Sequence, residues 1–145
     1  MSLFSALSIS ASGMSAQRTR AELVTENLAN AETTRTPEGG PYRRKDAVFQ
    51  TESVGSPFAS LMNSAMDEGA GGVSVAEILV DKREPEQRYM PGHPDAGVNG
   101  YVAYPRVNPA EEMVDLMSAS NGYQANVASM SALKEMILRS IDLLR

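Results

Sequence analysis

The residues best suited to acid–base or nucleophilic chemistry are one histidine and a nearby acid. His93 is the only histidine in the sequence, and Asp95 follows two positions later. A catalytic triad also needs a positioned serine and donors that stabilise an oxyanion, and the surrounding loop shows no nucleophile elbow. A structural or solvated histidine is therefore the better interpretation of His93.

Acidic and glycine-rich segments likewise predict no catalytic site. Glu111 and Glu112 are adjacent, so on a helix their carboxylates point apart. Gly69, Gly71 and Gly72 lack the Lys-Ser/Thr and the βαβ context of a phosphate-binding loop. With no cysteine and one histidine, the sequence offers no transition-metal cluster. We expect no enzyme activity, no cofactor and no small-molecule substrate.

Length and charge narrow the class of protein further. The chain has 145 residues and a formal net charge of −5, enough for one ordinary domain. It has no basic run, which argues against nucleic acid as a partner. No apolar run reaches the roughly 18 residues that span a bilayer, so we expect no membrane insertion. Residues 1–16 are small and apolar but serine-rich, and we interpret them as part of the mature protein.

The segment that must organise the fold is the last one, residues 108–145. Asn108 can cap a helix, Pro109 suits its first position, and Glu111 stands where a capping-box acid belongs. A helix of about 37 residues would be roughly 55 Å long, more than the ~30–35 Å width of a compact domain of this size. Its three-four apolar alternation predicts a seam that needs a partner helix. The seam consists of Met113, Leu116, Ser120, Tyr123, Val127, Met130, Lys134, Ile137, Ile141 and Leu144.

Residues 3–28 repeat this pattern near the N-terminus, and breaker residues between 33 and 41 end the helix. Two terminal helices joined through a middle region must pack antiparallel if they pair within one chain. They could form only a two-helix core, or copies could bundle together; we favour bundling because little else in the chain covers them. The N-terminal seam consists of Leu3, Leu7, Ser10, Met14, Gln17, Ala21, Val24 and Leu28.

The middle of the chain reads as short strands separated by turns. We expect strands near 42–51, 72–81, 87–90 and 100–104 and a short helix at 58–66. The predicted fold class is α+β, with a long antiparallel coiled-coil-like helix pair and one small, mostly antiparallel β unit. The predicted domains are a discontinuous helical inner domain, residues 1–33 and 108–145, and a β-rich outer domain, 34–107, with a variable loop at 53–72.

Several motifs resemble one family. Glu26-Asn27-Leu28-Ala29-Asn30-Ala31 resembles the N-terminal motif of bacterial flagellar axial proteins, which form the rod and hook. Asn121-Gly122 departs from that family, and Gly122 predicts a local kink or softened turn in the helix. The resemblance narrows to the proximal-rod proteins of the flagellar basal body through residues 36–45, 89–96, 99–102, 105–108, 111–115 and 123–127.

The resemblance implies terminal helices packed around a hollow axis, a β unit placed outward, and a shaft that crosses the periplasm and transmits torque from motor to hook. It implies copies of the chain, other flagellar rod proteins and, during secretion, the flagellar type III export apparatus as partners. Asn27, Asn30 and Asn126 are candidate polar register-setters. The candidate assembly interface is Leu3, Leu7, Met14, Ala21, Val24, Asn27, Leu28, Asn30, Met113, Leu116, Tyr123, Asn126, Val127, Met130, Ile137, Ile141 and Leu144.

Two other classes stay open at this point. A different rod subunit or a hook-type subunit would share the terminal helices, although the chain is too short for the extra outer domains of a hook protein. A soluble helical adaptor would fold as a stable monomer or small bundle. The rod interpretation instead expects poor helicity until subunits assemble, because the serine-rich N-terminal segment has low helix propensity.

Overall fold

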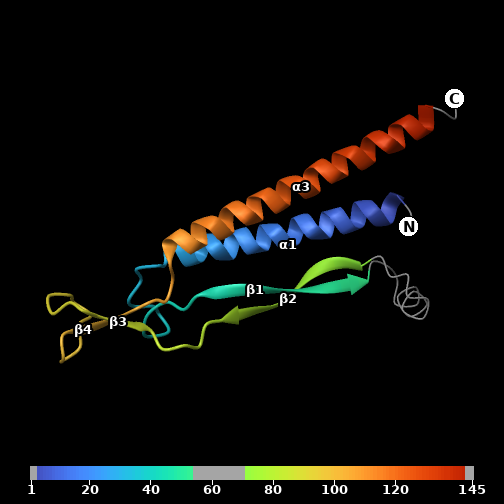
Figure 1. The fold of residues 1–145 in the computed structure, drawn as a ribbon. Coiled ribbons are helices and arrows are strands. Elements are labelled where there is room, and N and C mark those ends of the chain that lie inside the picture. The colour runs from blue at the N-terminus through green and yellow to red at the C-terminus, as the bar shows by residue number, and fades with distance from the viewer. Residues whose placement is uncertain (1–2, 54–70, 143–145) are drawn as a thin grey trace.

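Two long helices run antiparallel along most of the length of the molecule (Figure 1). In this computed structural model the described residues are 3–53 and 71–142. The predicted α+β class is confirmed, with both helices at the ends of the sequence and all four strands between them. The elements are α1 Leu3–Ala29, β1 Lys45–Ser53, β2 Gly71–Val80, β3 Glu86–Tyr89, β4 Tyr101–Tyr104 and α3 Pro109–Asp142.

Helix α3 begins where its sequence predicts. The side-chain Oδ1 of Asn108 accepts a hydrogen bond from the backbone N–H of Ala110 at 3.1 Å, which satisfies one of the free donors of the first turn. Its Nδ2 donates to Oε1 of Glu111 at 3.1 Å, so Glu111 supports the cap through the side chain of Asn108. Pro109 is the first helical residue, as expected for a ring that fixes φ and lacks an N–H.

Glycines let α1 and α3 approach closely. A Cβ built on Gly122 would lie 3.1 Å from Cδ of Gln17, and one on Gly13 would lie 3.0 Å from Nδ2 of Asn126. Ala119, which lies one turn before Gly122 on α3, is completely buried. Helix α3 runs without a break through Gly122, the position where the sequence predicts a local kink or softened turn. Gly122 is instead a site of close packing between helices.

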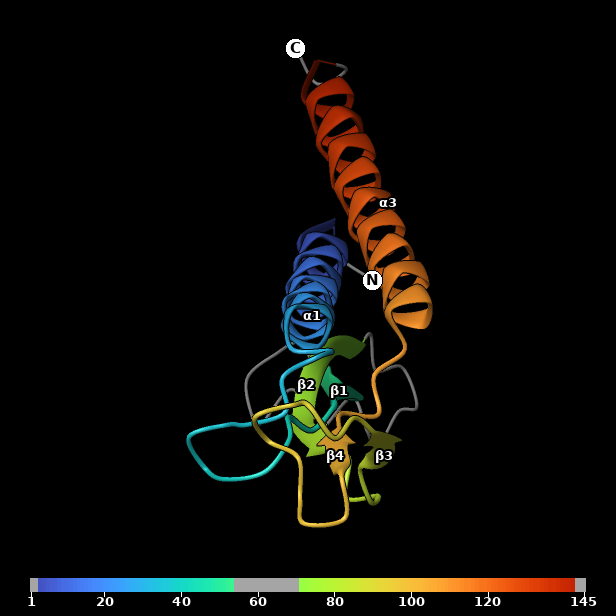
Figure 2. The same cartoon turned by 90° about the vertical axis from the view of Figure 1, so that its left-hand side faces the viewer.

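Strands β1 and β2 form a long antiparallel hairpin that lies along α1 on the side away from α3 (Figure 2). The pairing runs from Lys45 opposite Val80 to Ser53 opposite Gly71, with a bulge between Val48 and Phe49. Helix α1 is therefore the middle layer of the molecule. It contacts α3 on one side and both strands of the hairpin on the other.

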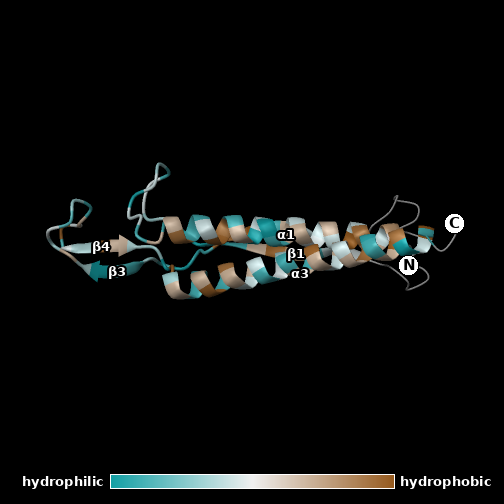
Figure 3. Ribbon diagram, turned by 90° about the horizontal axis from the view of Figure 1, so that it is seen from above, coloured by the Kyte–Doolittle hydropathy of each residue, from teal (hydrophilic) through white to brown (hydrophobic). Residues whose placement is uncertain are grey.

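Strands β3 and β4 form a second, shorter hairpin beyond the end of the helix pair (Figure 3). The small antiparallel β unit expected between the helices is present, and its four described strands are divided between two separate two-stranded sheets. Gly100 adopts a φ of +74° in the connecting loop, and a Cβ there would lie 2.9 Å from the ring of Tyr89. A glycine is required at this position for both reasons.

The boundaries of the hairpin β1–β2 differ from those expected. Strand β2 begins at Gly71, one residue before the start of the strand expected at 72–81. A Cβ on Gly71 would lie 2.3 Å from Cγ2 of Thr51, so the absent side chain lets the two strands pair. The expected helix at 58–66 and most of the variable loop at 53–72 lie outside the described residues. Within the described chain, neither helix has the length and apolarity needed to cross a membrane.

The close packing at Gly122 is testable by substitution. Valine has a higher helix propensity than glycine, so Gly122→Val would stabilise the helix if α1 were not in the way. We expect the free energy of unfolding to fall by about 1–3 kcal/mol because the added methyl groups meet Gln17. Thermal unfolding followed by circular dichroism measures this.

The matched control is Ala128→Val, at an exposed position of the same helix. Its cost should stay within the ~0.7 kcal/mol range of helix propensity. Equal losses for the two variants would contradict close packing at Gly122.

Candidate assembly interface

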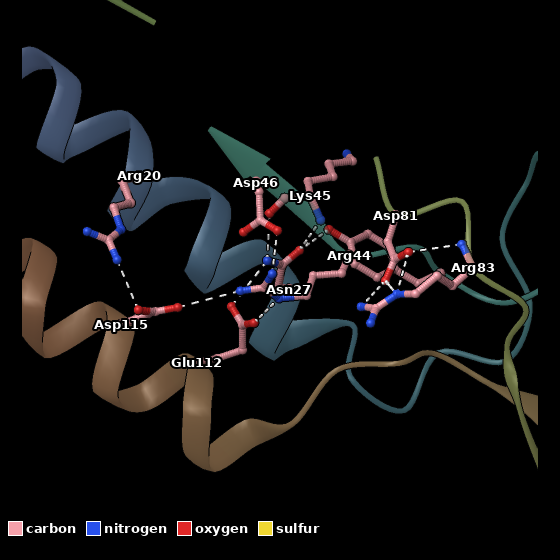
Figure 4. Close-up of polar contacts among 10 residues, drawn as sticks. Arg20, Asn27, Arg44, Lys45, Asp46, Asp81, Arg83, Glu112 and Asp115 are labelled. Carbon is pink, nitrogen blue, oxygen red and sulfur yellow. Dashed lines mark hydrogen bonds and ion pairs between the residues drawn. The ribbon is translucent and has the colours of Figure 1, made fainter. Parts of the chain in front are cut away.

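A fully buried asparagine joins the elements at one end of the helix pair (Figure 4). The Nδ2 of Asn27 donates to the backbone oxygen of Lys45 at 2.9 Å and to Oε2 of Glu112 at 3.2 Å. Its Oδ1 accepts from the hydroxyl of Tyr42 and from the backbone N–H of Lys45, both at 2.9 Å. All four hydrogen-bonding positions of the side-chain amide are therefore used.

Charged side chains extend this network onto α3. Glu112 is 1% exposed, and its carboxylate accepts from Nε of Arg44 as well as from Asn27. Asp115, one turn further along α3, accepts from Arg20 at 2.9 Å and from Arg44 at 3.5 Å. Removing one partner of such a buried pair is costly, since the other charge is left without compensation.

The guanidinium of Arg44 stays charged despite its position. Burial by itself would lower its pKa, but the hydrogen bond to Glu112 and the nearby carboxylates of Asp46 and Asp115 outweigh burial and raise the pKa above its ordinary value. Arg44 precedes β1 and contacts the first turns of α3. We call Arg20, Asn27, Tyr42, Arg44, Lys45, Glu112 and Asp115 the polar hub.

The candidate interface residues differ widely in their exposure. Val24 and Asn27 are buried within the chain, whereas Met113, Tyr123, Val127 and Ile141 are between 40% and 57% exposed. The seam predicted for α3 is thus rotated from the face that packs on α1. The side chains of Leu3 and Leu144 lie outside the described residues. The remaining apolar members are partly exposed: Leu7, Met14, Ala21, Leu28, Leu116, Met130 and Ile137.

The three candidate register-setting asparagines have different surroundings. Asn27 is the centre of the polar hub, so its hydrogen bonds hold the subunit itself together. Asn30 follows the last residue of α1; it donates to the backbone oxygen of Glu26 and accepts from the hydroxyl of Thr33. Asn126 donates to the backbone oxygen of Gly122 within α3. Asn126 in addition packs against the facing helix, at Gly13.

Two further sets of residues lie outside the candidate interface that the sequence pattern predicts. Further large apolar side chains on α3 are more than half exposed, but they lie off the three-four seam: Val114, Met117, Met136 and Leu138. Tyr42, Arg44 and Glu112 were not singled out as partners of Asn27. Sequence spacing could not reveal them, because they are 15 to 85 residues from Asn27.

His93 makes structural contacts in a turn-rich loop. Its Nδ1 accepts a hydrogen bond from the backbone N–H of Asp95 at 3.1 Å, and the carboxylate of Asp95 accepts from the hydroxyl of Thr34 at 2.7 Å. The pair therefore lacks the hydrogen bond from a histidine N–H to a carboxylate that a triad requires. Across residues 3–53 and 71–142 no group of acids and histidines is arranged to hold a metal ion.

The polar hub predicts a large effect for Asn27→Ala. The substitution leaves Tyr42, Glu112 and both backbone groups of Lys45 without their buried partner, and we expect a loss of about 2–3 kcal/mol in the free energy of unfolding. Chemical denaturation of the purified chain measures it. Asn121→Ala, at an exposed position of α3, is the control and should change stability by less than about 0.7 kcal/mol. A similar small change for Asn27→Ala would show that the hub is dispensable.

The raised pKa of Tyr42 predicts that the free energy of unfolding falls at alkaline pH. Burial, together with the carboxylates of Glu26 and Glu112, raises its pKa from 10.0 to about 12. The folded chain then keeps a proton that the unfolded chain loses, so the stability that Tyr42 contributes is complete below pH 10 and disappears as the pH rises through 12.

Denaturant unfolding between about pH 9 and 12 measures this effect. Tyr42→Phe should be less stable at neutral pH, because it lacks the hydroxyl that donates to Asn27, and should lose less stability across the alkaline range. Tyr89→Phe is the control, since Tyr89 is 66% exposed. Parallel curves for the native chain and Tyr42→Phe would contradict the assignment.

In comparisons with known proteins, the segments that contain the two helices match two families of flagellar rod proteins. Residues 7–35 match the family described as flagella basal body rod protein, and residues 98–143 match the flagellar basal body rod FlgEFG protein C-terminal family. The first match covers most of α1 and the second covers β4 and α3.

Full-length relatives narrow the assignment. The chain is 42% identical to flagellar basal-body rod protein FlgC of Bacillus subtilis, with 99% of each chain covered. It is 40% identical to the protein of that name from Borreliella burgdorferi, covering 100% of this chain and 99% of the relative. The identity to FlgC of Salmonella typhimurium is 37%, covering 99% and 98%. From its terminal helices to its middle region, this chain belongs to the FlgC family of flagellar basal-body rod proteins.

Proposed function

We propose that the chain is a structural subunit of the proximal rod, polymerising through its terminal helices into a hollow drive shaft that transmits torque from motor to hook. Membership of the FlgC family supports the place in the flagellar basal-body rod. The observation that carries the mechanism is the large apolar surface that α3 leaves uncovered. Met113, Val114 and Met117 near its start are 54–66% exposed, and Met136, Leu138 and Ile141 near its end are 52–57% exposed.

The arrangement of layers explains why this surface needs other chains. Among the described elements, α3 packs extensively only against α1, because the hairpin β1–β2 lies on the opposite side of α1. A helix of 34 residues is roughly 50 Å long, and one neighbour can cover only one side of it. Burying the rest against other helices contributes about 25 cal/mol for each Å² of apolar surface removed from water.

The same arrangement of layers suggests which segments of the chain lie inside the shaft and which lie outside. In the proposal, residues 1–33 and 108–145 form the helical inner part of the shaft, and residues 34–107 face outward. The hairpin β1–β2 would cover one side of α1 and so leave α3 as the helix that meets neighbouring subunits. The polar hub, where α1, β1 and α3 meet, would hold the two parts at a fixed angle.

The partners proposed are copies of this chain and other flagellar rod proteins, with the flagellar type III export apparatus as a partner during secretion. Assembly with rod proteins is the general property of the family to which the chain belongs. The proposed role needs no nucleic acid, membrane insertion, cofactor or substrate. It also needs no active site, in keeping with the structural contacts of His93.

Val127→Glu tests the proposed interface directly. Val127 is 40% exposed, so a glutamate can reach water in the free subunit and its charge would be buried only in an assembly. In a flagellated strain that lacks its own copy of this subunit, we expect the variant to give no swimming and no complete rods, while the purified chain keeps its circular dichroism spectrum and melting temperature.

Ser131→Glu, at an exposed polar position of α3, is the matched control and should support swimming. Normal motility with Val127→Glu would overturn the proposal that this face is covered in the rod. If Val127→Glu does not fold, the test uses Val127→Lys and Val127→Gln in its place. The swimming defects of these variants should increase with the cost of burying the introduced polar group.

A further inference from the structure

A cleft rich in arginine lies where three connecting segments of the chain converge. Its walls come from residues 41–44 before β1, residues 81–85 between β2 and β3, and Arg106 between β4 and α3. Arg43, Arg44, Arg83 and Arg106 line it together with one acid, Asp81. Pro41 and Pro85 contribute apolar walls, which reduce the access of water and strengthen the field of the charges.

Two of these four arginines are already paired with carboxylates. Arg83 donates from Nε to both oxygens of Asp81, at 3.0 and 2.9 Å, and its hydrogen bonds hold the pKa of Asp81 down to about 2. Arg44 is paired with Glu112 and Asp115 of the polar hub and with Asp46 of β1. The carboxylates that reach the cleft within the chain are therefore occupied by these two guanidinium groups.

The other two arginines make no ion pair with a carboxylate in residues 3–53 and 71–142. Arg43 donates from Nη1 to the backbone oxygen of Asp81, at 3.1 Å, and both Arg43 and Arg106 are exposed. Two such guanidinium groups beside an acid that is already satisfied leave the cleft with a positive excess. A guanidinium group presents donors in a planar fork that matches a carboxylate or a phosphate.

We propose that this cleft binds a carboxylate side chain from a second copy of this chain, held between Arg43 and Arg106. The inference rests on the proposed function, since it assigns a contact between subunits of the rod. The overall charge favours a copy of the same chain as the source, because 18 acidic residues exceed 13 basic ones. Exposed acids with no ion pair in the described part of the chain are available on its surface, among them Glu32, Glu38, Glu77 and Glu135.

The position of the cleft gives this contact a mechanical consequence. The hairpin β3–β4 is a separate two-stranded sheet, a kind of element that is marginal on its own, and it joins the rest of the molecule through the segments that line the cleft. A carboxylate bound to Arg43 and Arg106 would connect the segment before β1 with the segment after β4. Binding a neighbour would thus fix the orientation of the β3–β4 hairpin relative to the helix pair.

Arg106→Lys provides a direct chemical test. Lysine keeps the charge and supplies an amine, which a water-soluble carbodiimide couples without a spacer to a carboxylate in contact with it. With purified basal bodies from cells that make this variant, we expect a product with twice the mass of the subunit, in which mass spectrometry finds the introduced lysine joined to a glutamate or aspartate of the same sequence. Arg35→Lys, exposed and without an ion pair in the described residues, is the control and should give at least about tenfold less of this product.

The outcomes separate this inference from the proposed function. Two results overturn the contact between copies while leaving the rod function in place: assembled rods with no cross-linked product above the control, or rods in which the introduced lysine is joined to another protein. Absence of the chain from purified basal bodies would instead refute the proposed function.

A charge exchange provides the second measurement. Arg106→Glu should abolish swimming, and replacing the cross-linked acid with arginine in the same chain should restore it. Failure of this rescue, with both variants folded, contradicts the pairing.

Discussion

The structure depends on one fully buried amide whose hydrogen bonds are all made to other segments. Asn27 lies near the end of α1, and its side chain contacts the segment before β1, the first residue of β1 and the first turn of α3. A buried amide that lost these partners would pay the full cost of desolvation, so the three segments are tied to a single arrangement. The polar hub therefore fixes where α3 begins relative to α1, and the long helix carries that position along the molecule.

Beyond the polar hub, the two helices differ in how much of their surface is covered by the rest of the subunit. Helix α1 is the middle layer, with small residues such as Gly13 and Ala16 at or near its packed faces and the hairpin β1–β2 on its other side. Among the described elements, α3 packs extensively against α1 alone, and large apolar side chains are exposed from its start to its end. Figure 3 shows hydrophobic residues distributed along the α3 ribbon. In the isolated subunit, α1 is thus covered on two sides by other elements, whereas most of the surface of α3 is uncovered. An incomplete helix on a rigid support is a physical reason for a subunit to assemble with others.

A second set of groups, these ones charged, is incompletely paired in the cleft formed by residues 41–44, residues 81–85 and Arg106. The hub satisfies Arg20, Arg44 and Lys45 with acids of α1, β1 and α3, whereas the cleft beside it leaves Arg43 and Arg106 without an ion pair in the described residues. In the proposed assembly, apolar area on α3 would provide most of the driving force for association but little direction, because the hydrophobic effect is non-directional. Guanidinium groups in a cleft require a carboxylate in a defined place, and such contacts give register and specificity.

The sequence by itself determined the elements, because the signals for them are local. The Asn108-Pro109 cap predicted the start of α3, and the strands expected near 72–81, 87–90 and 100–104 correspond to β2, β3 and β4. Only the tertiary structure decided which face of α3 packs, that the strands form two hairpins, and that Asn27 is an internal link. Sequence periodicity favoured Met113 and Val127 as the seam, but the close approach at Gly13 and Gly122 turns smaller and polar residues toward α1. A local pattern fixes how a backbone folds, whereas the choice of packed face depends on the shape of a partner that lies about a hundred residues away in the chain.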